Sequence, residues 1–349
     1  MPTELPKSPG KSHRKPTGID LFAGCGGLTA GLKNAGYNVL AAVEIDERAR
    51  ETYSLNHPEV IFAGEDIREV DPARVMEQLG IKEGELDLLA GCPPCQGFSR
   101  MRKLNRTRAA RDNRNSLIDE FARFVTVLKP KLVMMENVPG LEDHYRFGDL
   151  VAQLKSMKYY VHFEVLDVAN YGVPQRRKRL ILVASKKLMP KLATPNVKRK
   201  NVRQTIGNLS EPGRSRDPVH NIPERRTPRV QAIIRAIPLD GGSRSQLPAE
   251  LRLKCHESTT GFKDVYGRMA WSEVSPTITG GCHNPSKGRF LHPEQNRTIT
   301  LREAAMLQGF PKNYKFNVSH GKEAIALMIG NALPPPFIEA HARALRRSL

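Results

Sequence analysis

The sequence predicts an α/β protein in which a large domain with a mainly parallel sheet carries a second, smaller and irregular domain. Seven short apolar runs rich in β-branched residues lie within residues 17–186, and amphipathic segments separate them. This alternation is typical of βαβ units, whose helices cover the faces of a parallel sheet. Beyond residue 186 the alternation gives way to segments rich in Pro, Arg and Ser. A chain of 349 residues is long enough for two such domains.

The expected strands follow one another through the first half of the chain. In order they are TGIDLFA, NVLAAVEI, EVIFAGEDI, ELDLLAGC, KLVMMENV, YVHFEVLDV and RLILVAS. A helix is expected between the fourth and fifth strands, because Asn115 or Ser116 can cap it and Pro130 follows its end. The apolar stripe of this helix, which should cover the sheet, consists of Leu117, Phe121, Phe124, Val125 and Leu128.

Helical patterns return near the C-terminus in TLREAAMLQGF, GKEAIALMIGNA and PPPFIEAHARALRRSL. We expect the last of these to return to the first domain and pack on it. The predicted organisation is a flexible basic tail over residues 1–16, a first domain over 17–186 that 322–349 complete, and a second domain over 187–321.

The charge balance favours nucleic acid as the partner. The chain has 55 Lys and Arg residues against 36 Asp and Glu residues, a formal net charge of +19. Such a surface attracts polyanions, because each phosphate that Lys or Arg neutralises releases a condensed counterion. General solubility, or an acidic protein partner, is the alternative explanation of the charge.

The composition also bears on location. The chain is 39% hydrophobic and contains no apolar run near 18 residues, so neither a disordered nor a membrane-spanning protein is expected. Its N-terminal segment has basic residues and prolines but lacks the apolar core of a signal peptide. We therefore expect a cytoplasmic protein with no membrane partner. Its five scattered cysteines are expected to be reduced thiols.

The run DLFAGCGGLTAG, residues 20–31, ends a strand in a glycine-rich turn that opens a helix. Backbone N–H groups and the helix dipole at such a turn receive an electronegative ligand. Gly24, Gly26 and Gly27 suit this turn. Thr29, however, stands where the dinucleotide fingerprint requires its third glycine, which disfavours an NAD site.

Acidic residues at successive strand ends narrow the choice of ligand. Glu44 follows the second strand, where it can accept hydrogen bonds from ribose hydroxyls, and Asp66 follows the third, where it could meet an adenine amine. Each carboxylate alone could equally be a helix N-cap. Taken with Asp20 at the end of the first strand, they favour a cofactor that contains adenosine.

The segment GCPPCQGFS, residues 91–99, follows the fourth strand and should lie beside the same crevice. Its two cysteines could form a redox pair, supply half of a metal site, or provide a nucleophile. A zinc site needs two further ligands, and Cys255 and Cys282 are isolated elsewhere, so we expect no metal. A disulfide exchanger has no need of an adenosine pocket beside it, which favours the nucleophile.

Taken in order, these segments resemble those of the DNA cytosine-5 methyltransferases of the bacterial, restriction-modification type. The resemblance covers nearly the whole chain and lies in DLFAGCGGL (20–28), GEDI (64–67), GCPPCQGFS (91–99), ENVPGL (136–141), QRRKRL (175–180), REAAMLQGFP (302–311) and GNALPPPF (330–337). It implies that residues 17–186, with 322–349, form a Rossmann-like catalytic domain that binds S-adenosyl-L-methionine. Residues 187–321 would then form the target-recognition domain, which PTITGG (276–281) helps to close.

The resemblance also implies covalent catalysis. Cys95 matches the family's nucleophile, so Cys92 is expected to be structural. Addition of the Cys95 thiolate to carbon 6 of cytosine turns carbon 5 into an enamine carbon that can attack a sulfonium methyl group. Glu136 matches the residue that binds the ring nitrogen N3 and the exocyclic amine. Arg177 and Arg179 alternate at the start of a strand and should share one face, where one could hold the base's O2 and the other Glu136 or the DNA backbone.

Further binding residues follow from the matching positions. Ile45 stands where some relatives place an aromatic residue against adenine, so we expect the stacking to be either weaker or supplied by Phe22. The residues predicted to bind the cofactor are Asp20, Phe22, Gly24, Gly26, Gly27, Leu28, Glu44, Ile45, Asp66, Ile67, Pro93, Asn331 and Ala332.

The basic segment 100–115 resembles the family's mobile active-site loop, which we expect to become ordered on the DNA backbone and cover the base. The target cytosine must first be extruded from double-stranded DNA. The residues predicted to bind DNA are Gln96, Ser99, Arg100, Arg102, Lys103 and Arg114.

We expect a monomer associated with the bacterial nucleoid, and a restriction endonuclease acting on the same site is a candidate partner. Two other functions stay open. A tRNA cytosine-5 methyltransferase would share the fold and nucleophile, although CQGFSR and the long variable region favour DNA. A catalytically silent DNA-binding relative is disfavoured, because Cys95, Glu136, Arg177 and Arg179 are all present.

Overall fold

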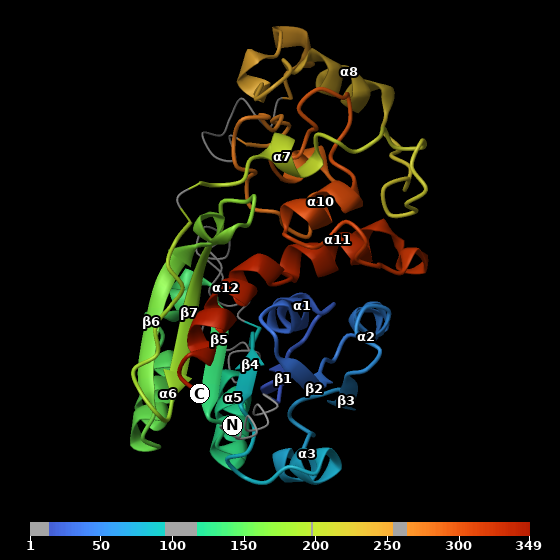
Figure 1. The fold of residues 1–349 in the computed structure, drawn as a ribbon. Helices are drawn as coiled ribbons and strands as arrows, with labels where there is room; N and C mark the ends of the chain where they lie inside the picture. Colours follow the sequence, from blue (N-terminus) through green and yellow to red (C-terminus); the bar gives the residue numbers. More distant parts are fainter. Residues whose placement is uncertain (1–13, 95–116, 197, 254–263) are drawn as a thin grey trace, which may run out of the picture.

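The computed structural model describes residues 14–94, 117–196, 198–253 and 264–349, and shows a sheet domain with an irregular region beside it (Figure 1). All seven runs expected to be strands belong to one sheet, which confirms the predicted α/β fold. The strands are β1 (Thr17–Leu21), β2 (Asn38–Val43), β3 (Ile61–Gly64), β4 (Leu88–Gly91), β5 (Leu132–Asn137), β6 (Tyr160–Asp167) and β7 (Lys178–Ser185).

The direction of one strand decides where the site forms. The strand order is β3-β2-β1-β4-β5-β7-β6. The pairs from β3 to β5 are parallel, whereas β7 is antiparallel to both β5 and β6. Strand β7 therefore begins at the edge of the sheet where β1, β4 and β5 end. Its register, with Glu136 opposite Ile181 and Asn137 opposite Leu180, brings Arg179 beside the end of β5.

Helices cover both faces of the sheet. The α-helices are α1 (Gly27–Asn34), α2 (Glu47–Ser54), α3 (Pro72–Leu79), α5 (Leu117–Leu128), α6 (Tyr145–Ser156), α7 (Val202–Ile206), α8 (Pro228–Ala236), α10 (Leu301–Leu307), α11 (Gly321–Asn331) and α12 (Pro335–Arg346). Short 3₁₀ helices lie at Pro139–Leu141, Val168–Tyr171, Arg244–Gln246, Ala249–Leu251, Pro285–Lys287 and Val318–His320. In the described ranges no helix is both long and apolar enough to cross a membrane.

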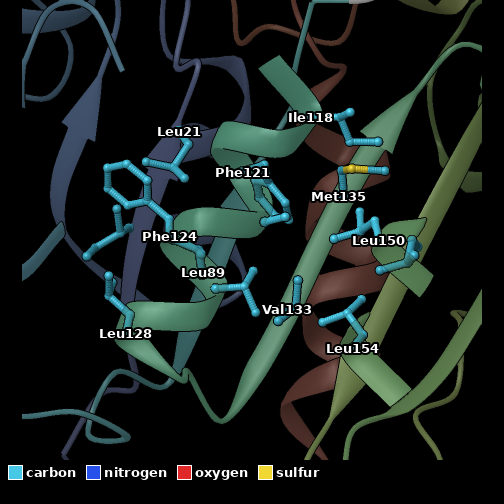
Figure 2. Packing of buried hydrophobic residues seen from close by; sticks show 14 of the residues in the cluster. Leu21, Leu89, Ile118, Phe121, Phe124, Leu128, Val133, Met135, Leu150 and Leu154 are labelled. Carbon is cyan, nitrogen blue, oxygen red and sulfur yellow. The ribbon is translucent and has the colours of Figure 1, made fainter. Parts of the chain in front are cut away.

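One face of the sheet packs against α5 and α6, as Figure 2 shows. Phe121 and Phe124 of α5 are fully buried in one apolar cluster with Leu89 of β4, Val133 of β5 and Leu154 of α6. Burying a side chain of this size contributes roughly 1.5–3 kcal/mol. This cluster fixes β4 and β5, the two strands whose ends carry the cysteine segment and Glu136.

Helix α5 is the helix that was expected after the cysteine segment. Most of its predicted apolar stripe is buried, and the helix ends before Lys129, which has a left-handed backbone with φ of 45°. The predicted caps, Asn115 and Ser116, lie outside the described residues.

The opposite face is covered by α1 and α12, which lie side by side (Figure 1). Leu32 of α1 and Phe337 and Ile338 of α12 share one apolar cluster with strand residues. Gly31 permits the close approach, because a Cβ there would lie 2.6 Å from the Cβ of Ile338 and 2.7 Å from the carbonyl oxygen of Pro335. The C-terminal helix thus packs on the sheet domain.

A third apolar cluster joins the sheet domain to the region after residue 186. It contains Cys25 and Ala30 beside Ile278, and it extends to Leu301 of α10 and Ile329 of α11. The predicted boundary between residues 321 and 322 stays a prediction, since this cluster includes residues from both sides of it.

The irregular region has a buried arginine at its centre. Arg268 is fully buried, and its guanidinium donates hydrogen bonds to the carbonyls of Ile234, Ile237, His292 and Gln295. The last carbonyls of a helix and those of loops need partners when they are buried, and five N–H donors on one side chain can supply several. Arg268 therefore caps the end of α8 and ties it to the loop that contains His292 and Gln295.

Replacing Gly31 by Ala should destabilise the protein by about 1–3 kcal/mol, because the added methyl overpacks the contact between α1 and α12. The matched control is Gly148→Ala in α6, where nothing lies within 4 Å of the added Cβ. Helix propensity should stabilise that variant by about 0.5–1 kcal/mol. Urea unfolding measures both, and equal stability of the two variants would contradict the packing described here.

Candidate active site

A cavity of about 890 Å³ opens at the edge of the sheet where the parallel strands end. Ligand sites of open α/β sheets form there, because loops from neighbouring strands converge beyond the carboxyl ends. Most of the residues predicted to bind the cofactor or to act in catalysis line this cavity. They are Phe22, Gly24, Leu28, Glu44, Ile45, Asp66, Ile67, Pro93, Glu136, Arg177, Arg179, Asn331 and Ala332.

The glycine-rich turn between β1 and α1 forms one wall. Gly24 lies at the cavity with a φ of 55°, and Gly26 caps α1 with a φ of 94°, conformations that glycine adopts without strain. A Cβ on Gly26 would lie 2.6 Å from Tyr314 Oη, and one on Gly27 would lie 2.4 Å from the Leu333 carbonyl oxygen. Gly26 and Gly27 are thus required by packing behind the turn and do not line the cavity.

Apolar side chains form the part of the cavity suited to a flat ring. Phe22 has a φ of 62°, which is uncommon for a bulky residue and marks a backbone held by its surroundings at a site. Ile45 also lines the cavity and is 61% exposed. Such exposure leaves its side chain free to cover a ligand.

The acidic residues of the cavity are held by the turns that carry them. Glu44 Oε2 accepts a hydrogen bond from the Gly24 N–H at 2.7 Å, and Oε1 accepts one from the Asp46 N–H at 2.9 Å. Burial raises the pKa of Glu44. Asp66 accepts hydrogen bonds from Arg68 Nε at 2.8 and 3.0 Å, and this contact lowers its pKa. Each oxygen of Glu44 retains a lone pair for a ligand, whereas both oxygens of Asp66 already accept two hydrogen bonds from Arg68.

Asp20 lies behind the cavity wall rather than at it. Its side chain is fully buried, and its Oδ2 accepts a hydrogen bond at 2.7 Å from the Thr29 hydroxyl, which also contacts Tyr53 Oη at 2.8 Å. Burial raises the pKa of Asp20 to about 7. Thr29, which stands where a dinucleotide fingerprint would have glycine, thus connects helix α1 to strand β1 through its hydrogen bond to Asp20.

Glu136 occupies the end of β5 and is 2% exposed. Its Oε1 lies 2.7 Å from Arg179 Nε, and its Oε2 lies 2.9 Å from Cys92 Sγ. The following residue, Asn137, donates from Nδ2 to the Pro93 carbonyl at 2.9 Å. The reversed direction of β7 is what allows a residue at its start to meet a residue at the end of β5.

The two predicted arginines take different partners. Both line the cavity, but Arg177 Nη1 donates to the carbonyls of Ile278 and Gly330, each at 3.0 Å, whereas Arg179 pairs with Glu136. Burial, together with the nearby positive charge of Arg179, lowers the pKa of Arg177 to about 9. Arg177 therefore connects the start of β7 to the irregular region and to α11.

Some predicted residues lie outside the described residues. They are the nucleophile Cys95 and the predicted DNA-binding residues Gln96, Ser99, Arg100, Arg102, Lys103 and Arg114. Pro94, the residue before Cys95, lines the cavity.

Sequence reasoning missed three features of the cavity. The structural role expected for Cys92 stays a prediction, and the sequence does not reveal that its thiol contacts Glu136. Arg68 and the α11 residues Leu327 and Met328 also line the wall. The helical pattern of α11 was visible in the sequence, but its contact with the glycine-rich turn depends on tertiary packing that no local pattern encodes.

Asp20→Asn should make stability less sensitive to pH. The folded protein holds this proton more tightly, because the pKa of Asp20 is about 7 when folded against 3.8 for the free side chain. The stability that the carboxyl contributes is therefore complete below about pH 4 and is lost as the pH rises to about 7. Relative to the variant, wild type should lose at most about 1.4 kcal/mol per pH unit up to that point.

Urea unfolding of both proteins in steps from pH 5 to pH 8 measures this difference. It should change up to about pH 7 and then level off. A difference in unfolding free energy that stays constant across the whole range would contradict a buried, protonated Asp20.

Comparison with known proteins identifies the family of the chain. The sequence model of the C-5 cytosine-specific DNA methylases matches residues 17–347. The chain is 36% identical over 347 residues to Type II methylase M.HgiDII of Herpetosiphon aurantiacus, covering 95% of each protein. It is 31% identical over 340 residues to Type II methyltransferase M1.HphI of Haemophilus parahaemolyticus, covering 94% of this chain and 86% of that protein.

A solved structure also shares the fold. The crystal structure of a prophage-encoded protein from E. coli superposes with a TM-score of 0.69 at 24% identity, covering 95% of this chain and 99% of the other. The structural likeness shows the fold alone, whereas the family is identified by the sequence model that matches residues 17–347. The chain belongs to the family of C-5 cytosine-specific DNA methylases.

Proposed function

We propose that the protein transfers a methyl group from S-adenosyl-L-methionine to carbon 5 of a cytosine flipped out of a specific short double-stranded DNA sequence, through an adduct of Cys95 with carbon 6. The observation that carries the proposal is the Glu136 carboxylate. It is almost fully buried, paired with Arg179, and faces a cavity whose wall includes the residue before Cys95. This supports a base-recognising acid that acts beside the segment carrying the proposed nucleophile.

The donor set of the cavity fits S-adenosyl-L-methionine. Phe22 and Ile67 offer apolar surface for a purine ring, and Glu44 retains lone pairs for the ribose hydroxyls. Asp66 would receive the adenine amine in exchange for one of the hydrogen bonds that it accepts from Arg68. When bound, this cofactor supplies a methyl group on a positively charged sulfur, so acidic side chains around it are favourable.

The chemistry of the chain follows from the weakness of carbon 5 as a nucleophile. The Cys95 thiolate would add to carbon 6 and push electron density into the ring. Glu136 would hydrogen-bond N3 and the exocyclic amine, which stabilises this density and selects cytosine. Arg179 keeps Glu136 in place and has further N–H donors for the base's O2.

The remaining steps restore the enzyme. After carbon 5 takes the methyl group, its proton leaves to a base, for which a water molecule is sufficient. The electron pair of that C–H bond re-forms the ring double bond, and the carbon–sulfur bond to Cys95 breaks. The product is 5-methylcytosine with the thiolate regenerated.

The DNA side of the proposal rests on charge and on the family. The net charge of +19 suits a polyanion. Residues 187–321 would read base edges in the major groove, and the basic segment 100–115 would close over the extruded base. The Type II names of the relatives support a restriction endonuclease acting on the same site as partner. The enzyme itself would be a monomer in the bacterial cytoplasm.

The adduct can be trapped with DNA that contains 5-fluorocytosine. Fluorine at carbon 5 cannot leave as a proton, so elimination fails and the protein should stay covalently bound in the presence of S-adenosyl-L-methionine. Denaturing electrophoresis followed by peptide mapping should locate the bond at Cys95.

Cys95→Ser is the control, and calorimetry should show that it binds S-adenosyl-L-methionine like wild type. An equal amount of trapped complex with this variant, or a bond mapped to Cys92, would overturn the assignment of the nucleophile.

A further inference from the structure

The thiol of Cys92 contacts the carboxylate that the proposed function places on the base. Cys92 directly follows β4, and Glu136 lies at the end of β5. These strands are parallel neighbours with Gly91 opposite Met135, so the next residue along each strand falls side by side. The resulting distance from Cys92 Sγ to Glu136 Oε2 is 2.9 Å.

Two contacts hold the Glu136 carboxylate, one on each oxygen. Arg179 Nε meets Oε1 at 2.7 Å, and within the described part of the chain Cys92 is the one hydrogen-bond donor found for Oε2. The last torsion of a glutamate side chain is broad, so a single contact leaves the plane of the carboxylate poorly fixed. The Cys92 thiol supplies the second contact that fixes it.

Cys92 is itself held firmly. Its N–H donates to the Leu21 carbonyl at 3.3 Å, and the Pro93 carbonyl accepts from Asn137 at 2.9 Å. Pro93 and Pro94 further restrict the backbone after it. A group that orients another side chain needs such rigid support.

The two cysteines of GCPPCQGFS are therefore expected to have different roles, one as a hydrogen-bond donor and the other as the nucleophile. Burial and the adjoining Glu136 carboxylate raise the pKa of Cys92 well above its ordinary range. Cys92 thus remains a thiol with a proton to donate, and it does not compete with Cys95 as a thiolate nucleophile.

We propose that Cys92 is a positioning residue whose S–H group orients Glu136 toward N3 and the exocyclic amine of the flipped cytosine. This inference rests on the proposed function and extends it. It predicts that loss of the thiol slows methyl transfer through Glu136 while the cofactor site stays intact.

The test measures single-turnover methyl transfer to DNA from methylation-deficient bacteria at saturating S-adenosyl-L-methionine and DNA. Cys92→Ala should lower the rate about 10- to 100-fold, the range expected for a lost hydrogen bond to a charged group. Cys92→Ser, which keeps a donor at nearly the same size as alanine, should recover most of the rate. Calorimetric affinity for S-adenosyl-L-methionine should not change in either variant.

Two further variants separate positioning from packing. Ser185→Ala removes a fully buried hydrogen-bond donor at the end of β7 away from the cavity, and it should transfer at the wild-type rate. In a protein that already carries Glu136→Gln, adding Cys92→Ala should lower the rate of methyl transfer little further. A residue that acts only through Glu136 has no further effect once the Glu136 carboxylate is gone. If Cys92→Ala does not fold, Cys92→Val fills the space without a donor and takes its place.

Each outcome bears on one idea. Equal rates for wild type and Cys92→Ala, a Ser variant as slow as the Ala variant, or fully multiplicative losses with Glu136→Gln would overturn the positioning role. Absence of transfer by wild type itself would overturn the proposed function, and the inference with it.

Discussion

The buried pair of Glu136 and Arg179 is the constraint on which the site depends. The free energy needed to remove both charges from water can exceed the Coulomb energy gained when they pair, so a buried pair is poor evidence of stabilisation. It can persist only where the backbone delivers both side chains to one point. Here β7 runs against β5, so the start of one strand meets the end of the other. The cavity, whose wall includes Cys92, Pro93 and Pro94, and the glycine-rich turn lie around that meeting point.

Much of this arrangement could be predicted from local pattern, and the rest could not. Apolar β-branched runs identified every strand of the sheet, and the rule that ligands lie beyond strand ends located Glu44, Asp66 and Glu136 at the cavity. The burial of Asp20 behind the wall and the reversal of β7 depend on contacts between distant segments. The contact of Cys92 with Glu136 could not be predicted for the same reason, since it arises from the pairing of β4 with β5.

The same edge of the sheet also connects chemistry to the irregular region. Gln175 Oε1 accepts from the Ile278 N–H at 2.9 Å, and its Nε2 donates to Gln308 Oε1 at 2.6 Å. Gln308 in turn donates to the carbonyl of Ala332, which lines the cavity. With Arg177 bound to Ile278 and Gly330, these contacts form one network. The placement of the cavity wall is therefore tied to the region expected to read the DNA target.

Base-resolution sequencing of 5-methylcytosine tests sequence-specific DNA methylation most directly. DNA and RNA would be taken from a methylation-deficient host that expresses either the protein or Cys95→Ser. The predicted result is methylation at one cytosine of a short DNA motif, absent with the variant. Methylation confined to a structured RNA, or none in either nucleic acid despite soluble protein that binds S-adenosyl-L-methionine, would contradict it.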